Sequence, residues 1–181
     1  MNIDVTNIPT PAYIVDERLL KKNLEILKYV SDQTGCKILL AQKAFSMYAT
    51  YPLIGKYLQG TTASSLFEAK LGKEEMEGEV HIFSPAYKEE EMNEILSICD
   101  HIVFNSFSQW KKYRNQIKAA DRKIECGIRI NPEYSEIETD MYNPCFTGSR
   151  LGVTYHNLSR KRWRVLTDFI FILCASRIPM Y

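Results

Sequence analysis

The chain has 181 residues, of which 45% are hydrophobic and 12% aromatic, and this composition indicates a globular protein with about one domain's worth of sequence. Its net charge of +1 and its lack of an apolar run of about 18 residues give no reason to expect a nucleic acid or a membrane as partner. Five cysteines without CxxC spacing, and no signal peptide before them, predict free thiols and a cytoplasmic protein. Three scattered histidines without ligand spacing argue against a zinc site, so we expect no metal.

The first long helix is predicted to follow Asp16, whose side chain can cap its amino end. Leu20, Leu24 and Leu27 then recur at helical spacing and line one face. Gly35 marks the end of this helix, because glycine readily adopts the left-handed conformation that follows a helix.

Segments of strand character recur along the chain, and most of them start about 18 to 25 residues apart, the length of a strand plus a crossover helix. They are AYIV (12–15), KILLAQK (37–43), TTASS (61–65), EVHIFS (79–84), HIVFNS (101–106) and IECGIRIN (124–131). Alternating strands and helices predict a parallel sheet. The chain has no GxGxxG motif after its first strand and no P-loop, so a (β/α)8 barrel fits better than a Rossmann sheet.

Two of the intervening helices carry further signals. Ser65 followed by Glu68 is a capping box, and Trp110, Tyr113 and Ile117 share one face of a later helix. These aromatic residues are interpreted as core packing.

In a barrel, functional groups lie at the carboxyl ends of the strands. Here those ends are polar, and they include Lys43, Ser64, Asn105 and Arg129. Lys43 has two interpretations on pattern alone. It either extends its ammonium group into solvent at the end of a strand, or is a reactive amine at the mouth of a barrel.

Several longer segments are more specific. They are PTPAYIVDE (9–17), LLAQKAFS (39–46), TTASSLFEA (61–69), FSPAY (83–87), FNSFSQW (104–110), CGIRINPEYSEIETDMYNPC (126–145) and SRLGVT (149–154). In this order they resemble the carboxynorspermidine/carboxyspermidine decarboxylases, which are fold type III (alanine racemase-like) enzymes that use pyridoxal 5'-phosphate. The resemblance runs from about residue 6 to residue 154.

The resemblance implies that Lys43 forms the Schiff base with the cofactor and is the catalytic lysine. Burial beside Ala41 and Ala44 is expected to lower the pKa of this lysine. Ala41 resembles the small residue that leaves room for the cofactor ring. Arg129 matches an arginine that reaches toward the cofactor in relatives, and its alternative is a structural salt bridge.

The implied substrate is carboxynorspermidine or carboxyspermidine, and the product is norspermidine or spermidine. A polycationic substrate favours acidic surroundings, and acidic residues crowd the loop after the last predicted strand: Glu133, Glu136, Glu138 and Asp140. A solvated acidic loop is the alternative interpretation. The family's sites form between two subunits, so a homodimer is expected of the full-length protein.

The sequence departs from the family in length. Residues 1–154 are interpreted as the N-terminal portion of a barrel with five of its eight strands, and the second β-domain is missing apart from the leading strand at 12–15. The chain is therefore interpreted as a truncated and inactive form of the enzyme. Residues 155–181 carry a net charge of +4, whereas the first 154 residues carry −3. We see there neither the helix nor the histidine-bearing strand of the family, and we interpret this segment as the product of a frameshift.

Two other functions remain open. One is a related activity on the same fold, such as diaminopimelate decarboxylation or alanine racemisation. The other is a non-catalytic protein with a single barrel that binds pyridoxal phosphate.

Overall fold

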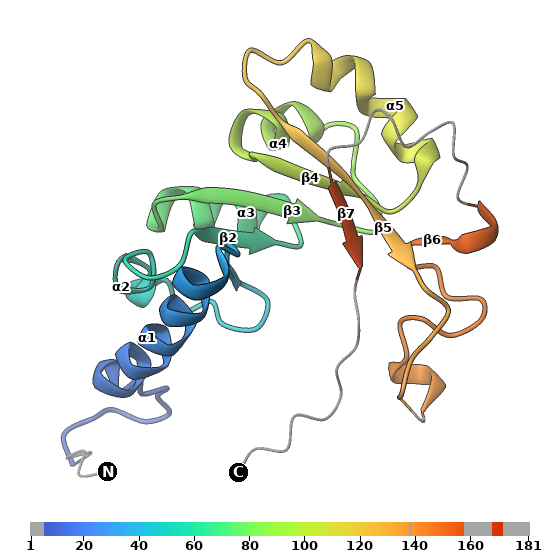
Figure 1. The fold of residues 1–181 in the computed structure, drawn as a ribbon. Coiled ribbons are helices and arrows are strands. Elements are labelled where there is room, and N and C mark those ends of the chain that lie inside the picture. Colours follow the sequence, from blue (N-terminus) through green and yellow to red (C-terminus); the bar gives the residue numbers. More distant parts are fainter. Residues whose placement is uncertain (1–5, 138, 158–167, 172–181) are drawn as a thin grey trace.

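The computed structural model describes residues 6–137, 139–157 and 168–171 (Figure 1). Its helices are α1 (Glu17–Thr34), α2 (Tyr51–Ile54), α3 (Leu66–Glu75), α4 (Met92–Ile98) and α5 (Phe107–Lys118), with short 3-10 turns at Tyr48–Thr50, Asp140–Tyr142 and Tyr155–Asn157. Its strands are β1 (Leu39–Ala41), β2 (Gly60–Ala63), β3 (Glu79–Phe83), β4 (His101–Phe104), β5 (Glu125–Asn131), β6 (Val153–Thr154) and β7 (Asp168–Phe171). In the described part of the chain, no helix has the length and apolar character needed to cross a membrane.

All strand pairs in the sheet are parallel, and strands β1 to β6 lie in sequence order. Helices α3, α4 and α5 cover one face of the twisted sheet, whereas α1 and α2 lie at its β1–β2 end (Figure 1). This order of strands, each followed by a crossover, is the arrangement of a partial (β/α)8 barrel and confirms the predicted α/β class.

Five of the predicted strands are present, and the differences concern the short and the terminal segments. Residues 12–15 form no strand, and Tyr13 is 95% exposed. The prediction was wrong here because a strand needs a neighbour, and no described strand runs beside this segment. Strand β6, which pairs with β5, was not predicted. Strand β7 also pairs with β5, and it lies within residues 155–181, where no strand was recognised from the sequence.

Helix α1 begins and ends where the sequence predicts. The Asp16 side chain accepts hydrogen bonds from the backbone N–H groups of Arg18 (2.9 Å) and Leu19 (3.3 Å). Desolvation is the largest single influence on the pKa of Asp16 and raises it. The hydrogen bonds to Arg18 and Leu19 together outweigh it, so the pKa of Asp16 lies below its usual value. At the other end, Gly35 has φ +70° and donates its N–H to the carbonyl of Ser31.

The amino end of α3 uses the predicted capping pair in a modified form. Ser65 Oγ accepts from the Glu68 N–H (3.3 Å), as a capping box requires. The Glu68 carboxylate, however, accepts from the N–H of Ser64 (2.6 Å), one residue before the cap. The end of β2 is thereby tied to the first turn of α3.

The main core lies between the sheet and α3, α4 and α5. Alternate residues of each strand point into it, so the other residues of the same strands point to the opposite face. The core members from β3 to β5 are Val80, Ile82, Ile102, Phe104, Cys126, Ile128 and Ile130. Trp110 and Tyr113 of α5 are buried against them and Ile117 is partly buried, which confirms the predicted packing role of this helix face.

The buried thiols of this core are expected to be unreactive. Cys99 has no exposed surface, and burial raises its pKa to about 12, so almost none of it is thiolate at neutral pH. Cys36, just after α1, is exposed. We predict that iodoacetamide at pH 7.5 alkylates Cys36 at least about 100-fold faster than Cys99, measured by mass spectrometry of the two peptides. Comparable rates in the native protein would contradict this, and in urea both thiols should react.

Candidate functional site

The carboxyl end of β1 places Lys43 in a tight turn. The carbonyl of Ala41, the last residue of β1, accepts hydrogen bonds from the N–H groups of Ala44 (2.9 Å) and Phe45 (3.2 Å). Tyr51 is buried in α2 and donates its hydroxyl to the carbonyl of Phe45 (3.3 Å). The turn that carries Lys43 is therefore closed by the strand before it and held by the helix after it.

Gln42 fixes which way this turn faces. Its backbone N–H extends the β1–β2 ladder to the Thr62 carbonyl (3.3 Å), and its side chain is buried. The side chain points toward α3, because a Cβ added at Gly72 would lie 3.1 Å from Gln42 Oε1. Leu40, on the same side, packs in the core formed by α1 and α2. Ala41 therefore lies on the sheet face opposite to these helices.

Lys43 itself is exposed and makes no hydrogen bond or ion pair with the part of the chain that the structure describes. The expectation that Ala41 and Ala44 bury it is wrong for this chain, since Ala44 is exposed too and Ala41 is only half-buried. Two small side chains cannot cover a four-carbon stem. Its position at the end of the first strand of the sheet is as predicted, and its role there stays a prediction.

Arg129 lies on β5 and is only 6% exposed. It alternates with Ile128 and Ile130, which face the helices, so it lies on the same sheet face as Ala41. Its guanidinium carbon is 4.8 Å from the centre of the Phe83 ring, a cation–π contact that crosses β4 to reach β3. The structure thus places Ala41 and Lys43 at the β1 end of the sheet and Arg129 four strands away.

Asn105, which follows β4, has a structural task. Its side-chain amide donates to the carbonyl of Arg150 (2.8 Å), and its Oδ1 accepts from the N–H of Gly152 (2.7 Å). These two bonds fix residues 150–152 against the sheet immediately before β6. The strand-end position of Asn105 was recognised from the sequence, but these partners, 45 and 47 residues away, were not.

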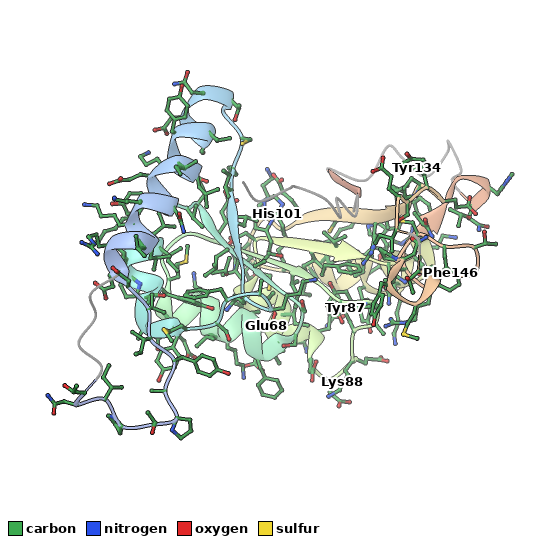
Figure 2. The ribbon with its side chains drawn as sticks, turned by 90° about the horizontal axis from the view of Figure 1, so that it is seen from below. Glu68, Tyr87, Lys88, His101, Tyr134 and Phe146 are labelled. Carbon is green, nitrogen blue, oxygen red and sulfur yellow. The ribbon has the colours of Figure 1, made fainter. Side chains whose placement is uncertain are left out.

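The acidic loop lies beyond β5. Glu133 and Glu136 are exposed, and Glu133 has a positive φ of 56°. Glu133 donates its backbone N–H to Oδ1 of Asn131 (2.9 Å), which is the last residue of β5. Asp140 begins a 3-10 turn, and Glu138 lies outside the described residues. Figure 2 shows Tyr134, which lies within this loop, and Phe146, which follows it, on the same side of the molecule.

Sequence reasoning missed a cluster at the other end of the strands, which consists of Glu79, His81 and His101. The two imidazole rings stack with their centres 3.9 Å apart, and Glu79 Oε2 lies 3.0 Å from His81 Nε2. Burial, more than any nearby charge, lowers the pKa of His81, and the hydrogen bond from Lys37 lowers the pKa of Glu79. Two of the three histidines are therefore not scattered, because the strand register pairs His81 with His101.

No family model matches the chain, but individual relatives do. A carboxyaminopropylagmatine decarboxylase of Synechocystis sp. is 40% identical over 176 residues, which cover 97% of this chain and 45% of that protein. A carboxynorspermidine/carboxyspermidine decarboxylase of Campylobacter jejuni is 45% identical over 146 residues, 81% of this chain and 37% of that protein. This chain also superposes on the crystal structure of the carboxynorspermidine decarboxylase of Campylobacter jejuni with norspermidine. The TM-score is 0.78 at 38% identity, and the superposition covers 91% of this chain.

The predicted resemblance to the carboxynorspermidine/carboxyspermidine decarboxylases is confirmed. The chain spans less than half the length of these curated decarboxylases, and 41% of the solved one. Its parallel sheet with flanking helices is part of their fold. The match to the Synechocystis decarboxylase covers 176 of the 181 residues of this chain. It therefore cannot end at residue 154 and extends into residues 155–181. The origin of that segment through a frameshift stays a prediction.

Proposed function

We propose that this chain belongs to a decarboxylase that removes the carboxylate of a carboxylated polyamine, with Lys43 as the residue that binds pyridoxal 5'-phosphate. One observation carries the proposal. In a chain related to such decarboxylases, a lysine with no partner among the described residues stands at the carboxyl end of the first strand of a parallel sheet. This is the edge at which barrel enzymes place their reactive groups.

The residues present fit the proposed cofactor. The Lys43 amine is not engaged by a carboxylate of the described residues, so it is available to an aldehyde. Ala41, two residues earlier, leaves space on the sheet face. When bound, pyridoxal phosphate supplies an electron sink for the charge left by the departing CO2. The Lys43 Nζ would then return a proton to the carbon that lost the carboxylate.

Arg129 would contribute a fixed positive charge on the same face. Its guanidinium is held by burial and by the Phe83 ring, so little side-chain freedom would be lost when an anionic group binds. Ala41, Lys43 and Arg129 would together bind the cofactor.

Two substrate classes are supported by different relatives. Carboxynorspermidine and carboxyspermidine follow from the Campylobacter jejuni enzymes, one of which was solved with norspermidine. Carboxyaminopropylagmatine follows from the Synechocystis enzyme, whose match covers the largest share of this chain among these relatives. The substrates differ at the end remote from the carboxylate, where one carries an amine and the other a guanidine. The rate of CO2 release by the full-length protein should be measured with the carboxylated polyamines, with carboxyaminopropylagmatine and with diaminopimelate. The substrate with the fastest release identifies the activity.

The proposed role of Lys43 is tested by substitution in the full-length protein. We expect Lys43→Ala to lose the absorbance of the lysine-bound cofactor and at least about a thousand-fold of the rate of CO2 release. Lys43→Arg should fail equally, because it keeps the charge but has no primary amine. Lys22→Ala, which alters an exposed lysine of α1, is the matched control and should keep both signals. An unchanged cofactor spectrum in Lys43→Ala would refute the assignment.

The proposal includes a homodimer as the active form, because the family's sites form between two subunits. Analytical ultracentrifugation of the full-length protein tests it, and an active monomer would contradict it.

A further inference from the structure

Glu79, His81 and His101 share the sheet face that is turned away from the helices. Glu79 and His81 are two residues apart in β3, so they point to the same side, and His101 is the register partner of His81 on β4. Their side chains are 30%, 19% and 18% exposed, so the cluster is sheltered but reachable from solvent. Figure 2 shows His101 on the sheet, apart from Tyr87 and Lys88, which follow the carboxyl end of β3.

The cluster lies at the amino end of the strands. Glu79 is the first residue of β3 and His101 the first residue of β4, whereas Lys43 follows the carboxyl end of β1. Whatever binds here is therefore separate from the proposed decarboxylation site, and this inference does not rest on the proposed function.

Three donor atoms converge in this cluster. Glu79 Oε2 lies 3.0 Å from His81 Nε2 and 3.8 Å from His101 Nε2, and the three ligand atoms all lie within 4.8 Å of one another. Ligands on one tetrahedral zinc ion lie about 3.3 Å apart, given bonds of about 2.0 Å. Small rotations that splay the stacked rings would bring all three atoms onto one ion.

The surrounding side chains orient the donors. Glu125 Oε2 is 3.6 Å from His101 Nδ1, so a carboxylate faces the ring nitrogen that points away from Glu79. This carboxylate–histidine arrangement is typical of metal sites, where the carboxylate fixes the tautomer and the orientation of the coordinating ring. The second oxygen of Glu79, Oε1, pairs with Lys37. Lys37 is 57% exposed, so its ammonium group can turn to solvent when a cation enters.

We propose that Glu79, His81 and His101 form a binding site for a divalent transition-metal ion, zinc in the first instance. Two imidazoles and one carboxylate suit zinc, cobalt or nickel, whereas magnesium and calcium prefer oxygen ligands alone. Three protein ligands leave a fourth position for water. Glu125 is the positioning residue for His101.

Isothermal titration calorimetry of the purified protein with Zn²⁺ tests the site, and the visible absorbance of Co²⁺ reports its geometry. We expect one ion per chain with a Kd below about 10 μM. His81→Gln and His101→Gln should each weaken binding at least about 100-fold, and Glu125→Gln about 10-fold to 100-fold. His156→Gln is the matched control, because His156 is exposed and lies outside the cluster, and it should leave the Kd unchanged. Cys36→Ser removes the exposed thiol as a competing ligand.

A second measurement needs no variant and therefore does not depend on whether the substituted proteins fold. In NMR spectra of the wild-type protein, Zn²⁺ should shift the ring resonances of His81 and His101 and leave those of His156 unchanged. No binding of Zn²⁺ up to about 1 mM, or binding that the two histidine variants leave intact, would overturn the proposal. Shifts of the ring resonances of His156 alone would also overturn the proposal.

Discussion

Phe104→Ala should destabilise the protein by about 3–5 kcal/mol, because it leaves a cavity at the centre of the main core. The Phe104 ring has no exposed surface. Its centre lies 5.7 Å from that of Tyr87, edge to face, and 6.2 Å from that of Tyr113, stacked. These rings fill the space between β4 and α5, and neither tyrosine can leave it without breaking hydrogen bonds. Urea unfolding followed by circular dichroism measures the loss.

The control for this prediction is Phe67→Ala. Phe67 is the same residue type and lies on α3, but it is 75% exposed. Its removal should change the free energy of unfolding by no more than about 0.5 kcal/mol. Equal losses for the two variants would mean that the core is not packed around Phe104.

The consequences of Phe104→Ala should extend to the polar groups that Tyr87 holds. The Tyr87 hydroxyl donates to the Val103 carbonyl (2.8 Å) and accepts from the Ser84 N–H (3.1 Å), and its burial raises the pKa of the hydroxyl. Tyr87 therefore joins the ends of β3 and β4. Because Asn105 follows Phe104 directly, a collapse of this ring would also disturb the contacts that Asn105 makes with residues 150–152.

Local signals predicted the elements that local interactions define. Asp16 and Gly35 mark the ends of α1 because each acts on backbone within a few residues. The strands from β2 to β5 were found for a related reason: each is a short run of residues that favour strands, and such a run is visible without knowledge of the neighbouring strand.

The elements that were missed depend on distant partners. Strand β6 has only two residues, too few for any periodicity, and it exists because residues just before it bind Asn105. Residues 12–15 have the composition of a strand but form none, since composition cannot supply the neighbour that a strand requires.

The candidate site was predicted in position but not in environment. The sequence places Lys43 at the end of a strand, yet exposure depends on what covers that end, which the flanking residues do not reveal. The same reason explains the histidines. Spacing along the chain separates His81 from His101 by 20 residues, and only the register of two parallel strands brings them together. The useful signal was that both lie near the start of consecutive predicted strands.

Gly152→Ala should cost about 2–5 kcal/mol, the sum of backbone strain and overlap. Gly152 has φ +86°, and an added Cβ would lie 2.9 Å from the backbone nitrogen of Asn131 and 3.0 Å from the carbonyl carbon of Ile130. It would also lie 3.2 Å from Arg129 Cγ, so the substitution should displace the arginine that is proposed to face the cofactor. The measurements are urea unfolding and, in the full-length protein, the affinity for pyridoxal phosphate.

Gly35→Ala separates the two contributions to this loss. Gly35 also has a positive φ, +70°, but an added Cβ would meet no atom within 4 Å, so only the strain of about 1–2 kcal/mol remains. The excess loss in Gly152→Ala therefore measures the close approach of residue 152 to β5. Cofactor affinity should fall in Gly152→Ala and stay unchanged in Gly35→Ala, because Gly35 precedes the amino end of β1, whereas Lys43 follows the carboxyl end of that strand. If both variants lost the same stability and neither lost cofactor affinity, the close approach of residue 152 to Arg129 would have no role in shaping the site.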